Sequence, residues 1–335
     1  MSRNSLSSAQ SALGRFGGTI TSRPSGPEKI QHFLNLYFDI FSPHWPFIHR
    51  ASFTMNQSNE SPLLVQSMLV IGMWVADTAS IRAAAVELHG KLGEAISEQR
   101  KKWDLSAASG SPGTTPQANP KFPLPMYQAI LLHIIFTLLH KGNGGSEAES
   151  KMSLALDLTL ALKSSPLTAR DLTLSLLSSL VQSCRRLGMF HYPSILTVCR
   201  ESPDEHTFLP HAWVSVEEVK RFNVALWRVC RAISGRSWAC PPTGRTDAGA
   251  GAGAAGGGVD GRQGNAKWEL RAAELRFPLP TNDAMWAAQT WEEWDSAVAR
   301  GRDEDVDVDA DVLGLGDYRE DEWISVAAGM LELLG

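Results

Sequence analysis

The sequence predicts an all-α fold, arranged as a single large multi-helix domain with low-complexity loop insertions. Apolar residues recur at steps of three and four along most of the 335-residue chain, and this spacing is the period of a helix. No segment alternates apolar and polar residues with the period of a strand. Clusters of Gly, Ser and Pro separate the periodic segments, as they do in loops between helices.

The first helix is predicted to begin at Glu28. Its apolar residues keep helical spacing as far as Phe41, so one face is expected to pack inward. Pro43 and Pro46 are expected to end it, because proline lacks a backbone donor and disfavours helix in the residue before it. Further helices are predicted at 63–75, 83–100, 126–139, 152–162, 168–187 and 215–233.

Two stretches, 63–76 and 129–139, are the most apolar of the chain. Both are shorter than the about 18 to 20 residues that a membrane span needs. We therefore interpret them as buried helices and expect no contact with a membrane.

The remaining segments divide the chain. Residues 1–27 are rich in Ser and Gly and are predicted to be disordered. The helical domain is predicted over 28–300, and 301–335 is predicted to be an acidic segment followed by a truncated C-terminal helix. Flexible loops are predicted at 104–120, 141–150 and 240–264, the last of which contains the low-complexity run AGAGAGAAGGG.

Charge is segregated along the chain. It carries 31 basic and 36 acidic residues, for a net charge of −5, and eleven of the acidic residues lie in 301–335. The body is thus only mildly basic, whereas a domain that grips DNA phosphates has a strongly basic face. In 1–27, three arginines without an acidic residue also fit a mitochondrial presequence. A mitochondrial helical protein therefore stays as an alternative.

One acidic run has a pattern that is compatible with a metal site. Asp305, Asp307 and Asp309 alternate along it, and carboxylates so spaced can bind calcium. Ala310 and Gly316, however, stand where a calcium loop needs glycine and glutamate. A helical metal-dependent enzyme using these three aspartates is kept as a second alternative, although no catalytic motif supports it.

Zinc and nucleotide cofactors are not expected in this chain. The histidine pairs His44/His49 and His206/His211 have zinc-finger spacing, but no cysteine pair precedes them. The glycines of the low-complexity run satisfy a dinucleotide motif without the strand that should come before it. The cysteines are too far apart for a metal or redox pair; they are Cys184, Cys199, Cys230 and Cys240.

The segment YFDIFSPHWPFIHRASF, from Tyr37 to Phe53, resembles the start of the fungal-specific transcription factor domain, or middle homology region. Further segments similar to that family follow in its order: IGMWVAD, AAAVELHGKLGEAISEQRKKW, PLPMYQAILLHIIFTLL, SCRRLGMFHYP, VEEVKRFNVALWRVCR and ELRFPLPTNDAMWAA. The second and third of these resemble the subgroup that carries N-terminal two-Cys two-His zinc fingers. The candidate site residues are those of the first motif and of SCRRLG: Tyr37, Phe38, Pro46, Phe47, His49, Arg50, Arg185, Arg186, Leu187 and Gly188.

The resemblance implies a nuclear, non-enzymatic regulatory domain of a fungal RNA polymerase II transcription factor. Such a domain would contact the transcription machinery or co-regulators, form a homodimer, or sense an effector. In the family, zinc and DNA are bound by a separate finger module, and no cysteine precedes Cys184 here. We therefore expect a chain truncated relative to the family, or a gene model that missed exons.

The charged family motifs also have local interpretations. Arg185 and Arg186 are expected near a helix C-terminus closed by Gly188, where cations stabilise the last carbonyls. His49 and Arg50 are expected to cap a neighbouring helix, with effector binding as the alternative. The run EEVKR at 217–221 has the spacing of ion pairs on a solvated helix face.

Tryptophan is concentrated in a segment near the acidic run. Asn282 or Asp283 is expected to cap a helix start there. Trp286, Trp291 and Trp294 follow, and their large rings are expected to be buried against another helix, with a groove for an aromatic ligand as the alternative.

Overall fold

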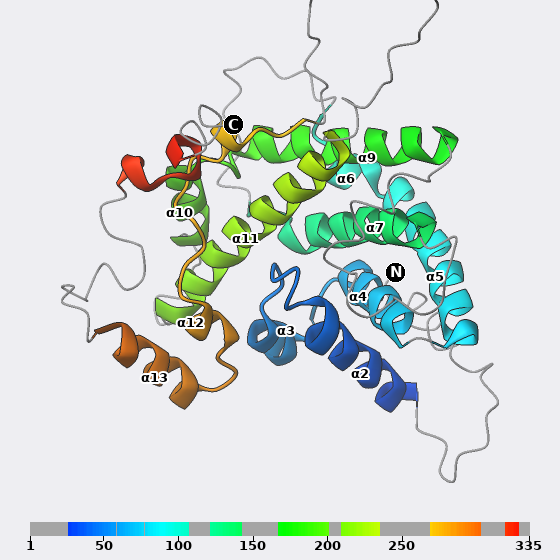
Figure 1. Cartoon of the computed structure of the whole chain (residues 1–335), viewed down its shortest axis with the longest axis horizontal. Helices are drawn as coiled ribbons and strands as arrows, with labels where there is room; N and C mark the ends of the chain where they lie inside the picture. The colour runs from blue at the N-terminus through cyan, green and yellow to red at the C-terminus, as the bar shows by residue number, and fades with distance from the viewer. Residues whose placement is uncertain are drawn as a thin grey trace, which may run out of the picture.

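The computed structural model describes residues 26–57, 59–76, 78–106, 121–142, 167–200, 209–234, 269–302 and 319–327. Within these ranges the fold is helical, and extended segments meet only in isolated bridges (Figure 1). The predicted all-α fold is confirmed. Most of 1–27, most of the three predicted loops, the predicted helix 152–162, the aspartates of 303–311 and the end of the chain lie outside the described residues.

The described helices follow one another along the chain in an order close to the predicted one. The longer ones are α2 (Gly26–Leu36), α3 (Arg50–Asn56), α4 (Pro62–Val75), α5 (Ala79–Glu98), α7 (Leu124–Gly142), α9 (Leu167–Leu187), α10 (Tyr192–Arg200), α11 (Leu209–Ser234) and α13 (Trp291–Arg302). The short ones are the π-helical turn η1 (Tyr37–Phe41), α6 (Arg100–Trp103), α12 (Asp283–Ala287) and the 3₁₀ turns η3 (Ala272–Glu274) and η4 (Glu320–Glu322).

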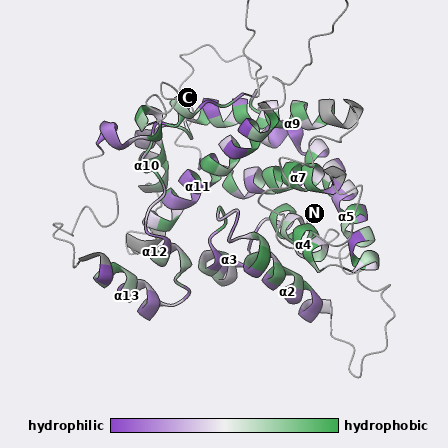
Figure 2. Ribbon diagram, in the orientation of Figure 1, coloured by the Kyte–Doolittle hydropathy of each residue, from purple (hydrophilic) through white to green (hydrophobic). Residues whose placement is uncertain are grey.

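Helices α4 and α7 form the centre of the core. Neither has a charged residue in its apolar stretch, and a helix that is apolar all round is buried all round. Helices α2, α5 and α7 pack on α4, and both central helices are predominantly hydrophobic in Figure 2. The prediction that these stretches are buried is confirmed, and none of the described helices has the length and apolar character of a membrane span.

The contact between α2 and α4 is unusually close. At Gly72 of α4, a side-chain carbon would lie 2.0 Å from the backbone oxygen of Phe33 in α2. Only glycine leaves room for this approach. It fixes α2, and with it the η1 turn that follows, on the centre of the core.

The chain after η1 turns inward. The last residue of η1 is Phe41, so the helical segment ends before Pro43, as predicted. Trp45 and Phe47 of the following turn are buried in the core. Arg228 of α11 holds this turn from the other side, because it donates to the His44 carbonyl at 2.9 Å and lies 4.2 Å from the centre of the Trp45 ring.

Helix α9 ends at a glycine stop. Gly188 has a φ of +70°, and the amide of Met189 donates to the Cys184 carbonyl at 3.1 Å. This is the closure predicted for the C-terminus of the helix. The chain then pairs with a distant segment through two backbone hydrogen bonds. The Arg276 N–H donates to the Phe190 carbonyl and the Tyr192 N–H donates to the Arg276 carbonyl, each at 2.9 Å.

Residues 275–278 lie between two other segments. One neighbour is 190–192, and the other is 323–325. In the second pairing the backbone N–H of Ile324 donates to the Phe277 carbonyl and that of Ser325 to the Leu275 carbonyl, each at 3.0 Å. A three-stranded arrangement of single bridges thus joins the SCRRLGMFHYP and ELRFPLP motifs. Helices α12 and α13 continue from it toward the N-terminal end of α11 (Figure 1).

Candidate functional site

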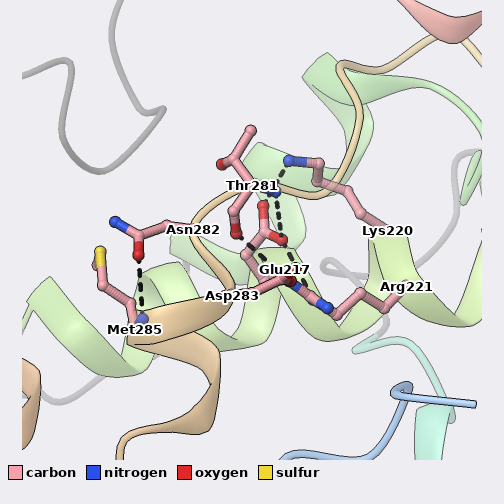
Figure 3. A network of polar contacts seen from close by, with 7 residues as sticks. All are labelled: Glu217, Lys220, Arg221, Thr281, Asn282, Asp283 and Met285. Atoms are coloured by element: carbon pink, nitrogen blue, oxygen red, sulfur yellow. Dashed lines mark hydrogen bonds and ion pairs between the residues drawn. The ribbon is translucent and has the colours of Figure 1, made fainter. Parts of the chain in front are cut away.

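Helix α11 carries two consecutive glutamates that bind different parts of the chain. Glu218 binds the turn before α3 and the core helix α7. Glu217 binds two cations of α11 itself and the segment before α12. We call these two carboxylates and their partners the α11 junction, and its Glu217 half is drawn in Figure 3.

The Glu218 carboxylate accepts two hydrogen bonds at the same oxygen. The backbone N–H of His49 and the side-chain amide of Gln128 each donate to Oε1 at 3.1 Å. Gln128 also donates to the Phe47 carbonyl at 2.9 Å. The carboxylate therefore joins the proline turn of the first family motif to α7 and α11.

The two hydrogen-bond donors to this carboxylate, the His49 N–H and the Gln128 amide, are both neutral. Burial raises the pKa of Glu218 from its ordinary value of 4.5 to about 7, with a smaller rise from Glu60, and its two N–H donors only partly oppose this. Burial and then the charge of Glu218 raise the pKa of Tyr37. The same two causes raise the pKa of Cys199 to about 12. A negative charge at Glu218 is thus poorly solvated in the folded chain.

A carboxyl whose pKa is higher in the folded than in the unfolded state binds its proton more tightly when folded. Its contribution to stability therefore falls as the pH rises from 4.5 to about 7. Glu218→Gln removes this titration, so its free energy of unfolding should fall less over that range than that of the unmodified chain. Urea denaturation at several pH values between about pH 5 and pH 8 measures the difference. Glu94→Gln, at an exposed position of α5, should follow the unmodified chain, and parallel curves for all three proteins would contradict the assignment.

The Glu217 carboxylate is the centre of a buried ion cluster. It accepts a short hydrogen bond from Lys220 Nζ, and Arg221 Nε lies 3.5 Å from its other oxygen. The backbone N–H of Thr281 donates to it at 3.3 Å (Figure 3). The predicted ion pairs at helical spacing are therefore confirmed.

The prediction that these ion pairs lie on a solvated face is wrong. Glu217, Lys220 and Arg221 are all less than 8% exposed. The segment 279–282 and helix α12 cover them, and the helix pattern alone carries no information on what a distant segment covers. Burial lowers the pKa of Lys220, although the adjacent Glu217 charge opposes this.

Arg221 connects the cluster to α12. Its guanidinium donates to Asp283 Oδ1 at 2.8 Å and to the Thr281 carbonyl at 3.3 Å. It also lies 4.5 Å from the centre of the Trp286 ring, on which the His49 ring packs at 4.9 Å. Arg221 thereby brings α12 and the first family motif together on α11.

The remaining polar residues of the first motif act locally. His49 Nδ1 accepts from the backbone N–H of Ser52 at 3.3 Å, so His49 caps α3. Arg50 pairs with Asp39 at 2.7 Å and lies over the Phe38 ring. The other residues of this motif among the candidates are core residues or part of the turn: Tyr37, Phe38, Pro46 and Phe47.

The two arginines of the SCRRLG motif have different surroundings. Arg185 forms a two-pronged ion pair with Glu274, at 2.7 and 2.9 Å, and also donates to the Glu269 carbonyl. Burial alone would raise the pKa of Glu274, but the hydrogen bonds from Arg185 hold it below its ordinary value. Arg186 is exposed. Arg185 therefore tethers the segment 269–274 to the end of α9.

Replacing Arg185 by lysine should lower the free energy of unfolding, whereas the same replacement at Arg186 should change it little. Arg185→Lys loses the two-pronged geometry, because an ammonium group cannot match both carboxylate oxygens. We expect the free energy of unfolding to fall by about 1 to 2 kcal/mol, measured by urea denaturation. Arg186→Lys is the matched control and should stay within about 0.5 kcal/mol. Equal losses in both variants would show that the tether contributes nothing.

Comparison with known proteins assigns the N-terminal half of this fold. Residues 34–196 match the family described as the fungal specific transcription factor domain. This part of the chain is similar to the fungal specific transcription factor domain. The match includes both motifs that hold the candidate site residues and extends from α2 into α10. Helix α11 and the segments 269–302 and 319–327 come after it in the sequence.

One curated relative is named as a zinc finger protein. Over 112 residues the chain is 31% identical to zinc finger protein zas1 of the fission yeast Schizosaccharomyces pombe (strain 972 / ATCC 24843). That match covers 33% of this chain and 10% of the relative, so the chain corresponds to a small part of that protein. No solved structure matches the chain.

The matched residues 34–196 and the segments after them contain no metal cluster in the part that the structure describes. No group of three or more His, Cys, Asp or Glu side chains is placed to hold an ion there. Cys184 and Cys230 are buried, and burial raises the pKa of both thiols, to about 12 for Cys230. Activated cysteine nucleophiles have lowered pKa values instead.

The α11 junction itself was missed as a site at the level of sequence. A signal was present, because apolar residues of α11 occur on both sides of its charged run and inside it: Val216, Phe222 and Val219. All three are buried in the structure. A charged run enclosed by apolar positions within a long helix indicates buried charge, provided that a partner segment exists to complete it.

Proposed function

We propose that this chain is the regulatory part of a fungal RNA polymerase II transcription factor, acting in the nucleus through contacts with the transcription machinery or co-regulators. The match of residues 34–196 to a transcription factor family carries the proposal. In it, the chain is not an enzyme and holds no cofactor of its own. Zinc and DNA binding are assigned to a finger module of the kind that the name of the relative records.

The geometry of the α11 junction supports a regulatory role over a catalytic one. Two charged groups of the junction with displaced pKa values, Glu218 and Lys220, are engaged with backbone and side-chain partners inside the fold. Catalytic groups with displaced pKa values instead line a cleft that a substrate can enter. The junction links the family domain to the segments after it, so a partner that binds either part can influence the other.

A reporter experiment tests the proposal. The chain is fused to an unrelated DNA-binding module in a fungal cell, with that module alone as the control. We expect the fusion to change reporter expression severalfold, in either direction, and to accumulate in the nucleus. Unchanged expression from a folded nuclear fusion would overturn the proposed role.

A mobility-shift experiment tests the assignment of DNA binding to another module. The purified chain is titrated into labelled DNA fragments with and without excess nonspecific competitor. We expect no complex that survives the competitor. Tight, sequence-specific binding by this chain alone would overturn that part of the proposal.

A further inference from the structure

Helices α12 and α13 form an arm, residues 281–298, that packs on the N-terminal part of α11. The arm has a small hydrophobic cluster of its own, separate from the main core. Trp213 and Val214 of α11 supply one side of it, and Met285 and Ala297 supply the other. Partly buried side chains at its edge are Trp286, Trp294 and Val298.

Charged groups lie under the arm beside this cluster. Arg221 contacts Asp283 and Trp286 of the arm, and Glu217 accepts from the Thr281 amide. Removing two or more charges from water is costly, and much of the cost is recovered when water returns. Release of the arm is therefore opposed by a small apolar cluster and by these few polar contacts, and it is assisted by hydration of the ions beneath.

Two further features favour release of the arm, one in its ion pair with α11 and one in its backbone. The Asp283 side chain is 91% exposed, and ion pairs in water contribute little. Asn282 has a φ of 52°, the one positive φ among the described residues that are not glycine, and such a backbone stores strain. The strained residue lies where the arm leaves the bridged segment 275–278, in the position of a hinge.

The surface under the arm has a definite chemical preference. It presents the Arg221 guanidinium and the His49 ring beside the apolar Trp213 and Val214. Its present occupant matches this, because residues 281–298 contain four acidic and no basic residues. In the arm an acidic residue, Asp283, precedes the buried methionine and the adjacent tryptophan ring.

We propose that this surface is a docking site for an acidic, aromatic segment of a partner protein, and that the arm occupies the site within the chain. The partner segment places a carboxylate on Arg221 and a large apolar side chain between Trp213 and Val214. Binding requires displacement of the arm, so the arm regulates access. This inference rests on the proposed function, since it specifies where a protein contact is made.

The arm itself supplies the probe. A fluorescein-labelled peptide of residues 281–298 is titrated with the full chain and with its Met285→Asp variant, using fluorescence anisotropy. Met285 is fully buried, and a carboxylate in its place should release the arm. Because an occupied site weakens apparent binding in proportion to its occupancy, we expect the variant to bind the peptide about tenfold more tightly or better.

Two controls locate the binding. Adding Val214→Glu to the Met285→Asp variant should weaken peptide binding about tenfold by closing the apolar part of the site, whereas adding Val326→Glu, at an exposed valine elsewhere, should not. A scrambled peptide should not bind, and circular dichroism melting confirms that each variant is folded.

Absent or equal binding by the folded proteins would overturn the docking site. So would sedimentation showing that copies of the chain exchange arms while the peptide stays unbound. A fusion that alters the reporter while its chain binds no peptide would overturn the docking site alone, whereas an unchanged reporter would overturn the proposed function.

Discussion

Glu217→Ala should lower the free energy of unfolding by about 3 to 5 kcal/mol, as expected when one partner of a buried ion cluster is removed. The change leaves Lys220 and Arg221 buried with no carboxylate between them, and it removes the acceptor for the Thr281 amide. Urea denaturation followed by circular dichroism measures the loss. The arm should also become more accessible to proteases, because the segment before α12 loses its attachment.

The exposed ion pair of α5 provides the control for Glu217→Ala. Glu87 and Lys91 pair at 2.9 Å at helical spacing, but both are more than 50% exposed. Glu87→Ala should cost no more than about 0.5 kcal/mol. Replacing both Glu217 and Lys220, by Leu and Met, should recover part of the loss, because an apolar pair needs no counter-charge. A loss at Glu217 no larger than that at Glu87 would contradict a buried cluster.

Helical periodicity predicted the helices of the core because it is a local property. The stretches at 63–75 and 126–139 correspond to α4 and α7. Their predicted starts were late by one to a few residues, as was that of α11, which begins at Leu209 rather than 215. In all three the observed helix includes a proline in its first turn, where its missing N–H has no helical partner to lose. A proline at such a position belongs to the first turn of the helix that follows it.

The contacts that form the α11 junction depend on residues far apart in the sequence. Glu218 and its donor at His49 are 169 residues apart, and Arg185 and Glu274 are 89 apart. Local reasoning gave both arginines of SCRRLG the same role at a helix end. It could not show that Arg185 faces a carboxylate from another segment.

The family resemblance added what local patterns could not. It marked the first motif and SCRRLG as belonging together, and the structure connects both to α11, through Glu218 and through Asn223, which donates to the Met189 carbonyl. It did not predict the ion cluster at Glu217, although two segments that resemble the family contain the residues of that cluster, because similarity of separate segments does not show which side chains face each other. Residues 281–283 also lie after the part of the chain that the family comparison matches.

Gly72→Ala should be among the most damaging single-methyl changes in the chain. The added carbon would lie 2.0 Å from the Phe33 carbonyl oxygen, and the obstacle is backbone rather than a flexible side chain. Helices α2 and α4 must separate to admit it, which should cost about 3 kcal/mol of unfolding free energy, in spite of the about 1 kcal/mol that alanine gains over glycine in a helix.

Gly90→Ala in α5 meets nothing within 4 Å and should be stabilising by up to about 1 kcal/mol. Thermal and urea denaturation compare the two variants directly. Similar effects of the two changes would show that α2 does not lie against Gly72, and the placement of the η1 turn on the core would fall with it.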